Sequence, residues 1–281
     1  MMTPPGGLSS PEETKRCCAA VYGSEWARFL LGDSYHPGGL VLTERLGTLL
    51  GLEPGTRVLD VAAGTGGSAI YLADRFGCRV MGLDLSAANV AAAREAAERA
   101  GVAELTEFVA GDAERLPFPD QSFDAVICEC AFCTFPDKAR AAVEFARILR
   151  QGGRVGLSDL TREGPLSREL EGLLAWIACI ADARPLAEYQ AYLQYADFLI
   201  EQTERHDDAL QAMIRGIQTK LMGIDLLVGL RKLDLPSIDL GQARAMARSA
   251  AEAARTGALG YVLLTGTRSP VRIGPNPLAI R

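Results

Sequence analysis

Apolar runs and amphipathic stretches alternate through the first half of the chain. The runs at residues 57–62, 79–83 and 123–130 are almost continuously apolar, which is typical of strands that a sheet buries on both faces. The stretches between them, at 68–76 and 86–100, carry apolar residues at helical spacing. This alternation predicts βαβ units, and therefore an α/β fold with a doubly wound parallel sheet.

The pattern is mainly helical on both sides of this region. Before it, helical spacing covers residues 11–31 and 40–50, and residues 1–10 are rich in Pro, Gly and Ser and are expected to be disordered. After it, the expected elements are a helix at 137–150, a strand opened by Gly152-Gly153, helices at 166–180 and 186–196, a strand at 198–204, a helical extension at 207–255 and a last strand at 260–266.

A glycine-rich turn, Gly64-Thr65-Gly66-Gly67, joins the first strand to its helix, and Asp84 ends the second strand. Doubly wound sheets bind ligands at the carboxyl ends of their strands, so this turn is the predicted ligand site. Glycine lets the backbone approach a ligand closely, and the helix that follows offers unpaired amides to a negative group. The carboxylate of Asp84 suits the two hydroxyls of a ribose. Dinucleotide enzymes share these features, so later motifs must identify the ligand.

Two later motifs follow in order. Residues 109–118 read VAGDAERLPF, a third strand ending in Gly111-Asp112-Ala113, and residues 123–130 read FDAVICEC, a fourth strand. Together with the glycine turn, they make residues 58–159 resemble an S-adenosylmethionine-dependent methyltransferase of the seven-stranded, Rossmann-like class. The resemblance implies that fold, that cofactor and a methyl-transfer activity.

The resemblance also implies a role for each motif residue. The methionine moiety would be held by Asp60, Ala62, Gly64, Thr65 and Gly66, the ribose and adenine by Asp84 with Leu85, and the adenine by Asp112 with Ala113. Glu129 would lie under the sulfonium, and Tyr22 would belong to an N-terminal lid. Simpler alternatives are a turn cap for Asp112, a solvated strand end for Glu129, a packed aromatic for Tyr22 and an ordinary turn residue for His36. The family has glycine where Ala62 stands, so this chain is expected to contact the methionine end of the cofactor differently.

The resulting domain organisation has three parts. They are an N-terminal helical lid segment (1–50), a cofactor-binding core (51–160), and a C-terminal part (161–281) holding a substrate cover, the helical extension and the last strands of the sheet. No apolar run reaches the length of a membrane span.

Composition narrows the class of substrate and the compartment. With 29 basic and 35 acidic residues the net charge is −6, which argues against a nucleic-acid partner and favours a small molecule. The N-terminus has neither a basic region nor an apolar core of a signal peptide, so a cytoplasmic location is expected. In that compartment the seven cysteines are expected to be reduced and to act as core fillers, ligands or reactive thiols.

The cysteines raise a specific possibility for the methyl acceptor. An oxygen or nitrogen acceptor often needs a base, and the chain has only two histidines, neither in a motif. Cys128, Cys130 and Cys133 lie at and just beyond the end of the fourth strand, and Cys179 lies three residues after a Trp on the cover helix. Strand neighbours two apart start about 6.6 Å from each other, so a pair from the strand end and the cover helix is the better chelate.

A narrower resemblance concerns these thiols. Cys130 stands six residues before Pro136-Asp137-Lys138, Cys179 follows Trp176-Ile177-Ala178, and Ser158-Asp159 closes the fifth strand. In these positions the chain is similar to arsenite methyltransferases, which implies Cys130 and Cys179 as ligands of trivalent arsenic, whose lone pair attacks the methyl. The further cysteine of that family would fall near Ala69. Cys17, Cys18, Cys133 or a small thiol such as glutathione would then supply the third sulfur, while Cys78 and Cys128 are expected to fill core.

Two other hypotheses stay open. The chain is alternatively a small-molecule carbon or oxygen methyltransferase of the quinone or secondary-metabolite kind, with Tyr189, Tyr192 and Tyr195 lining an apolar pocket. A third hypothesis, a protein that senses the cofactor or a metalloid without turnover, depends only on the missing glycine at Ala62.

Overall fold

The computed structural model describes residues 36–170, 180, 182–229 and 240–270. The strands are β1 (Arg57–Val61), β2 (Arg79–Asp84), β3 (Thr106–Ala110), β4 (Phe123–Glu129), β5 (Leu149–Arg162), β6 (Phe198–Arg205) and β7 (Leu259–Arg268). The α-helices are α3 (Gly39–Leu49), α4 (Gly67–Phe76), α5 (Ala87–Ala100), α6 (Lys138–Ile148), α8 (Leu186–Tyr195), α9 (Asp207–Gly229) and α10 (Leu240–Thr256), and short 3₁₀ turns are η1 (Phe132–Thr134) and η2 (Arg168–Leu170).

The strands form one seven-stranded sheet in the order β3-β2-β1-β4-β5-β7-β6. The first five strands of this order run parallel, and β7 is antiparallel to both of its neighbours. The order reverses between β1 and β4, which makes the carboxyl ends of these two strands the topological switch point where such sheets bind ligands. The prediction of a Rossmann-like, doubly wound seven-stranded sheet is confirmed.

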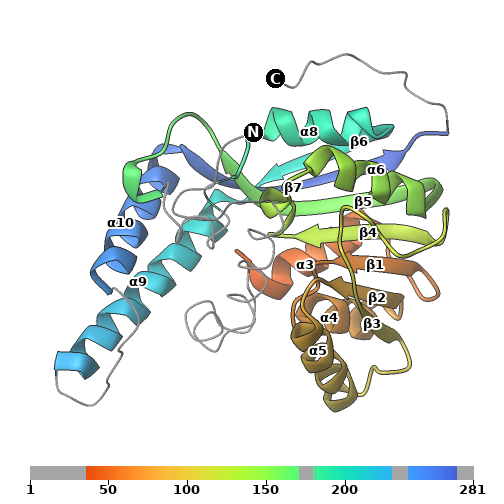
Figure 1. Cartoon of the computed structure of the whole chain (residues 1–281), viewed down its shortest axis with the longest axis horizontal. Coiled ribbons are helices and arrows are strands. Elements are labelled where there is room, and N and C mark those ends of the chain that lie inside the picture. The colour runs from red at the N-terminus through yellow and green to blue at the C-terminus, as the bar shows by residue number, and fades with distance from the viewer. Residues whose placement is uncertain (1–35, 171–179, 181, 230–239, 271–281) are drawn as a thin grey trace.

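Helices cover both faces of the sheet, and each face has its own hydrophobic core (Figure 1). On one face α3, α4 and α5 bury apolar side chains such as Leu46, Leu72 and Ala93. On the other face α6 and α8 contribute Phe145 and Leu193. Successive side chains of a strand point to opposite sides of the sheet, so alternate residues along each strand contribute to the two different cores.

The helical extension consists of α9 and α10, which pack against each other and, near the sheet, against β7 (Figure 1). Leu221, Ile224 and Ala247 form a small apolar cluster between these two helices. No helix in the described part of the chain is both long and apolar enough to cross a membrane.

Several element boundaries differ from the expected ones. The third strand ends at Ala110, before Gly111-Asp112-Ala113, which form a turn instead. Helix α6 ends at Ile148, because β5 begins directly at Leu149. Of the helix expected at 166–180, only the 3₁₀ turn η2 and isolated positions are described, so most of that prediction lies outside the described residues.

Candidate active site

The glycine turn between β1 and α4 is shaped by left-handed backbone conformations. Gly64 and Gly66 have φ values of 55° and 85°, a region that residues with a Cβ rarely enter. A Cβ on Gly66 would also lie 3.0 Å from the Cβ of Ala93 and from the ring of Phe108. Glycine is therefore required at this position for two reasons, the left-handed backbone angle and the close packing of α5.

Ala62 is the residue that stands where the resemblance expects glycine, and its φ is 60°. The left-handed region costs an L-residue about 1–2 kcal/mol relative to its normal conformation. Alanine is thus accommodated here under strain. Cys130, at the end of the neighbouring strand β4, is also left-handed with φ 51°. Such strain at two adjacent strand ends is common at functional sites.

Asp84 ties the end of β2 to the glycine turn. Its Oδ2 accepts the backbone N–H of Gly64 at 2.8 Å, and its Oδ1 accepts the N–H of Ser86 at 2.8 Å and Nδ2 of Asn89 at 3.1 Å. Ser86 in turn caps α5 by accepting the N–H of Asn89, as its position before the helix predicts. The carboxylate is held in place before any ligand arrives.

Asp60 is a buried carboxyl group on β1 with one unsatisfied oxygen. Its side chain is completely buried and receives a backbone hydrogen bond from Ala69, but Oδ2 has no hydrogen-bond partner. Burial, followed by the nearby charges of Glu129 and Asp84, raises the pKa of Asp60 well above its usual range. Asp60 lines a cavity together with the glycine turn, which makes the unsatisfied oxygen a candidate acceptor for a hydrogen-bond donor of a ligand.

Glu129 is the centre of a hydrogen-bonded network at the end of β4. Its side chain is 4% exposed, so the alternative of a solvated strand end is wrong. The carboxylate accepts the hydroxyls of Ser68 at 2.5 Å, Thr43 at 3.0 Å and Ser158 at 3.2 Å. These donors come from α4, α3 and β5, elements far apart in sequence. Three donors on one carboxylate fix its orientation.

His36 joins this network from the segment before α3. It is 8% exposed, its Nε2 lies 3.6 Å from Oε2 of Glu129, and it lines the same cavity as Asp60 and Glu129. The sequence alone favoured His36 as an ordinary turn residue, which does not predict this placement. It also predicted no contact with Glu129 for Thr43, Ser68 or Ser158. The contact joins residues 93 positions apart, since 129 − 36 = 93, and no local sequence pattern reports it. Its only signal was the scarcity of histidine in the chain.

The residues expected around the adenine lie along the same edge of the sheet. Asp112 Oδ1 accepts the N–H of Glu114 at 2.9 Å, which is the turn-capping role named as its alternative. Ala113 is buried, while the side chain of Leu85 is 41% exposed beside the end of β2. Their contacts with adenine stay predictions, and Tyr22 lies outside the described residues.

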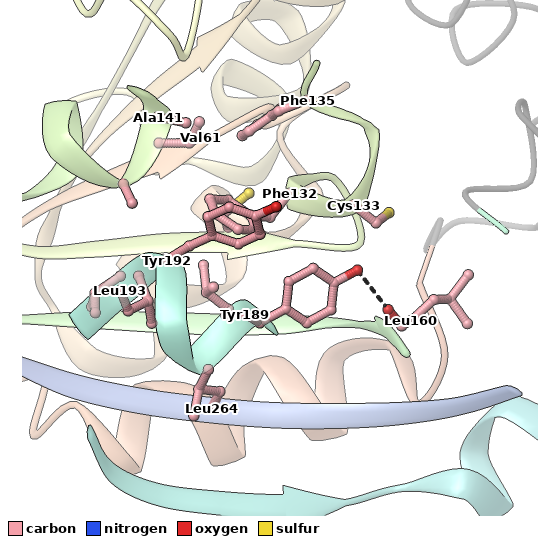
Figure 2. Close-up of a cluster of buried hydrophobic side chains, with 14 of the residues drawn as sticks. Val61, Phe132, Cys133, Phe135, Ala141, Leu160, Tyr189, Tyr192, Leu193 and Leu264 are labelled. Atoms are coloured by element: carbon pink, nitrogen blue, oxygen red, sulfur yellow. Dashed lines mark hydrogen bonds between the residues drawn. The ribbon is translucent and has the colours of Figure 1, made fainter. Parts of the chain in front are cut away.

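The described cysteines are distributed between the core and the strand end. Cys78, Cys128 and Cys133 are fully buried, and Cys133 lies in the apolar cluster around Phe132 (Figure 2). Burial raises the pKa of the Cys78 thiol to about 11, and burial with nearby carboxylates, Asp159 first, raises that of Cys128 well above its usual range. Cys130 is half-buried, and its N–H donates to the carbonyl of Ser158.

The predicted arsenic site depends on residues that the structure does not describe. Cys17, Cys18 and Cys179 all lie outside the described residues, so the pairing of Cys130 with Cys179 stays a prediction. Within the described ranges, no three His, Cys, Asp or Glu side chains are grouped as a metal site. The described lining of the cavity contains no cysteine.

The three tyrosines of α8 do not share one environment. Tyr189 is buried beneath Phe132, with its hydroxyl donating to the carbonyl of Leu160 at 2.9 Å (Figure 2). Tyr192 is also buried against Phe132, but Tyr195 is 57% exposed. The expectation that all three line one apolar pocket is therefore wrong for Tyr195.

Comparisons with known proteins agree with this geometry. Residues 59–157 match the model of a methyltransferase domain family. The chain is 32% identical over 237 residues to a 27-O-demethylrifamycin SV methyltransferase of Amycolatopsis mediterranei, covering 81% of this chain and 82% of that protein. It is 31% identical over 160 residues to the methyltransferase GfsG of Streptomyces halstedii, covering 57% of this chain and 58% of that one.

A solved structure shows the same fold. The geranyl diphosphate C-methyltransferase of Streptomyces coelicolor A3(2), in complex with Mg²⁺, geranyl diphosphate and S-adenosyl-L-homocysteine, superimposes with a TM-score of 0.71 at 18% identity. The match covers 93% of this chain and the whole of that one.

Proposed function

This chain belongs to the S-adenosylmethionine-dependent methyltransferases that act on small molecules, and from this premise we propose that its acceptor is a hydroxyl oxygen of an organic molecule. The observation that carries the proposal is the imidazole of His36 beside the carboxylate of Glu129 in the cavity of the glycine turn. A hydroxyl loses its proton when it is methylated, so an oxygen acceptor needs a base there.

The residues present fit the cofactor. The unsatisfied Oδ2 of Asp60 offers an acceptor to the ammonium group of the methionine moiety, and Asp84 offers its carboxylate to the ribose. Left-handed Gly64 and Gly66 keep the turn free of side chains where the backbone meets the ligand. Bound S-adenosylmethionine supplies a methyl group on a positively charged sulfur.

The chain's own residues provide the electrostatic setting. The buried carboxyl groups of Asp60 and Glu129 line one cavity, where little water screens their interactions. A cationic ligand is favoured in such a site, and a pre-oriented carboxylate costs no reorganisation when charge moves during the reaction. Glu129, held by three hydroxyls, has this property.

A relative supports an oxygen acceptor of natural-product size. The name of the Amycolatopsis protein gives 27-O-demethylrifamycin SV as its substrate, a compound that lacks a methyl group on an oxygen. The two other proteins described above do not carry arsenic in their names either. The arsenic interpretation depends on Cys130 and Cys179, of which only Cys130 is described. Arsenite is therefore included among the acceptors in the experiment below.

The test is a methyl-transfer assay with deuterated S-adenosylmethionine and three classes of acceptor. These are hydroxylated polyketides, including 27-O-demethylrifamycin SV, small amines such as phosphoethanolamine, and arsenite with glutathione. Mass spectrometry is expected to find the label on a hydroxyl oxygen. Label on arsenic alone, lost in Cys130→Ser and kept in the control Cys78→Ala, would contradict the proposal and restore the thiolate interpretation.

A further inference from the structure

His36 is held so that one ring nitrogen faces the backbone and the other faces the network. Nδ1 lies 3.3 Å from the carbonyl of Pro37, while Nε2 lies 3.4 Å from Oγ1 of Thr43. A carbonyl oxygen only accepts, so the Nδ1 contact is satisfied by an N–H on Nδ1. In the neutral ring this tautomer leaves the lone pair on Nε2.

The hydroxyl of Thr43 does not donate its hydrogen to that lone pair. A hydroxyl has one hydrogen, and Thr43 donates it to Oε2 of Glu129 at 3.0 Å, a shorter contact than the 3.4 Å to His36. The oxygen of Thr43 and the carboxylate of Glu129 are then both acceptors near Nε2. Their arrangement stabilises a proton that arrives on Nε2.

Resting on the proposed oxygen acceptor, we propose that Nε2 of His36 is the general base of methyl transfer and that Glu129 is its positioning residue. The acceptor oxygen forms a bond to the methyl carbon while the bond from that carbon to the sulfonium sulfur breaks. The electron pair of the broken bond stays on sulfur, which gives S-adenosylhomocysteine. The hydroxyl proton passes to Nε2, and Glu129, 3.6 Å away, balances the charge of the imidazolium.

Among the described residues, the other ionisable groups that line the cavity of His36 are Asp60 and Glu129, and both are acids. Carboxyl groups at this distance favour the positive charge that the ring of His36 gains with the proton of the acceptor.

The experiment compares His36→Gln and His36→Ala with the matched control His206→Gln. His206, the other histidine, is half-buried beside Glu204 in the short connection between β6 and α9, and it is absent from the described lining of the cavity. With the acceptor found in the assay above, kcat should fall on the order of 10²- to 10⁴-fold in both His36 variants. The affinity for S-adenosylmethionine, measured by calorimetry, should stay unchanged.

Two further readouts separate a base from a structural residue. Added imidazole should restore part of the activity of His36→Ala, since it can take the proton from the vacated space. Glu129→Gln should lower kcat without rescue by imidazole, because the positioning group and not the base is missing. Circular dichroism of each variant establishes that the fold is kept.

Specific results would overturn this assignment. An unchanged kcat in His36→Gln excludes His36 as the base while leaving the oxygen acceptor intact. Weaker cofactor binding with normal kcat at saturation makes His36 a cofactor ligand instead. If the wild-type protein binds cofactor but methylates none of the hydroxylic compounds, the proposed function is wrong, and the assignment of His36 as the base is then wrong too.

Discussion

The backbone N–H of Gly64 donates to Oδ2 of Asp84 at 2.8 Å, so the glycine turn after β1 is tied to the end of β2. One carboxylate thereby fixes the turn that we propose to approach the cofactor, and the same carboxylate is the group that we propose to bind the ribose.

Asp84→Asn is expected to loosen this connection. An amide nitrogen cannot accept, so at least one of the N–H groups of Gly64 and Ser86 loses its partner. These donors are only partly buried, so the lost hydrogen bond should cost about 1 kcal/mol. Urea denaturation should show this loss, and calorimetry should show weaker S-adenosylmethionine binding. Asp74→Asn, on the exposed side of α4, is the control and should change neither quantity.

Ala62→Gly and Gly66→Ala should change stability in opposite directions. Glycine at 62 relieves a left-handed alanine, which is expected to raise the free energy of unfolding by about 1 kcal/mol. Alanine at 66 adds the same strain and a Cβ only 3.0 Å from Ala93, so it should lower stability and cofactor affinity. Thermal unfolding checks both signs, and a destabilised Ala62→Gly would contradict the strain argument.

Asp60 should make the stability of the cofactor-free protein depend on pH. Because its folded pKa is raised, the native state binds a proton that the unfolded chain has released. The free energy of unfolding therefore falls as pH rises from the unfolded value of about 3.9 up to the folded pKa. The slope contributed by one group reaches at most about 1.4 kcal/mol per pH unit.

Asp60→Asn should remove this contribution and flatten the curve measured by urea denaturation between pH 4 and 8. The same variant should bind S-adenosylmethionine more weakly, because an amide is a poorer partner than a carboxylate for a cation. Equal pH slopes for the wild type and Asp60→Asn would show that the carboxyl group titrates normally in the fold.

The buried thiols should resist alkylation in the native protein. Only the thiolate reacts, and burial raises the pKa of Cys78 to about 11 and that of Cys128 well above its usual range. At pH 8, mass spectrometry after iodoacetamide treatment should find both residues unmodified, and modified once urea is added. Rapid native labelling of Cys128 would mean that the end of β4 opens more often than its burial implies.

Tyr189→Phe and Tyr195→Phe form a matched pair on α8. The buried Tyr189 donates to the carbonyl of Leu160 at 2.9 Å (Figure 2). It also accepts the N–H of Arg184 at 3.0 Å. Its loss should cost about 1–3 kcal/mol of stability because a buried partner is left unsatisfied. Tyr195 is 57% exposed and its variant should be nearly neutral. Equal effects on the melting temperature would contradict the difference in burial.

Much of the cofactor site follows from local sequence. The apolar runs, the glycines of the turn, Asp84 at a strand end and Ser86 as a helix cap all depend on neighbours within a few residues. The matches to methyltransferases agree with the predicted family and cofactor, and they replace the hypothesis of a sensor without turnover. Local rules failed at Asp112, where the strand ends earlier, because pairing with β2 stops at Ala110.

The acceptor side of the site was not predictable in this way. Glu129 was assigned a place under the sulfonium, but its partners Thr43, Ser68 and Ser158 come from three other elements. His36 looked like a turn residue because nothing near it in sequence carries chemistry. Cys133 was predicted as a possible third arsenic ligand, yet it is completely buried, whereas Cys78 and Cys128 fill core as expected.

The sequence by itself determined the alternation of strands and helices, the glycine turn and the acidic strand ends, since each depends on backbone preferences and hydrophobic period over short distances. Only the tertiary structure decided which side chains share the cavity. Packing of α3 and α4 on the sheet brings His36, Ser68 and Glu129 together. Such contacts depend on how distant elements pack, and no periodicity in the chain encodes them.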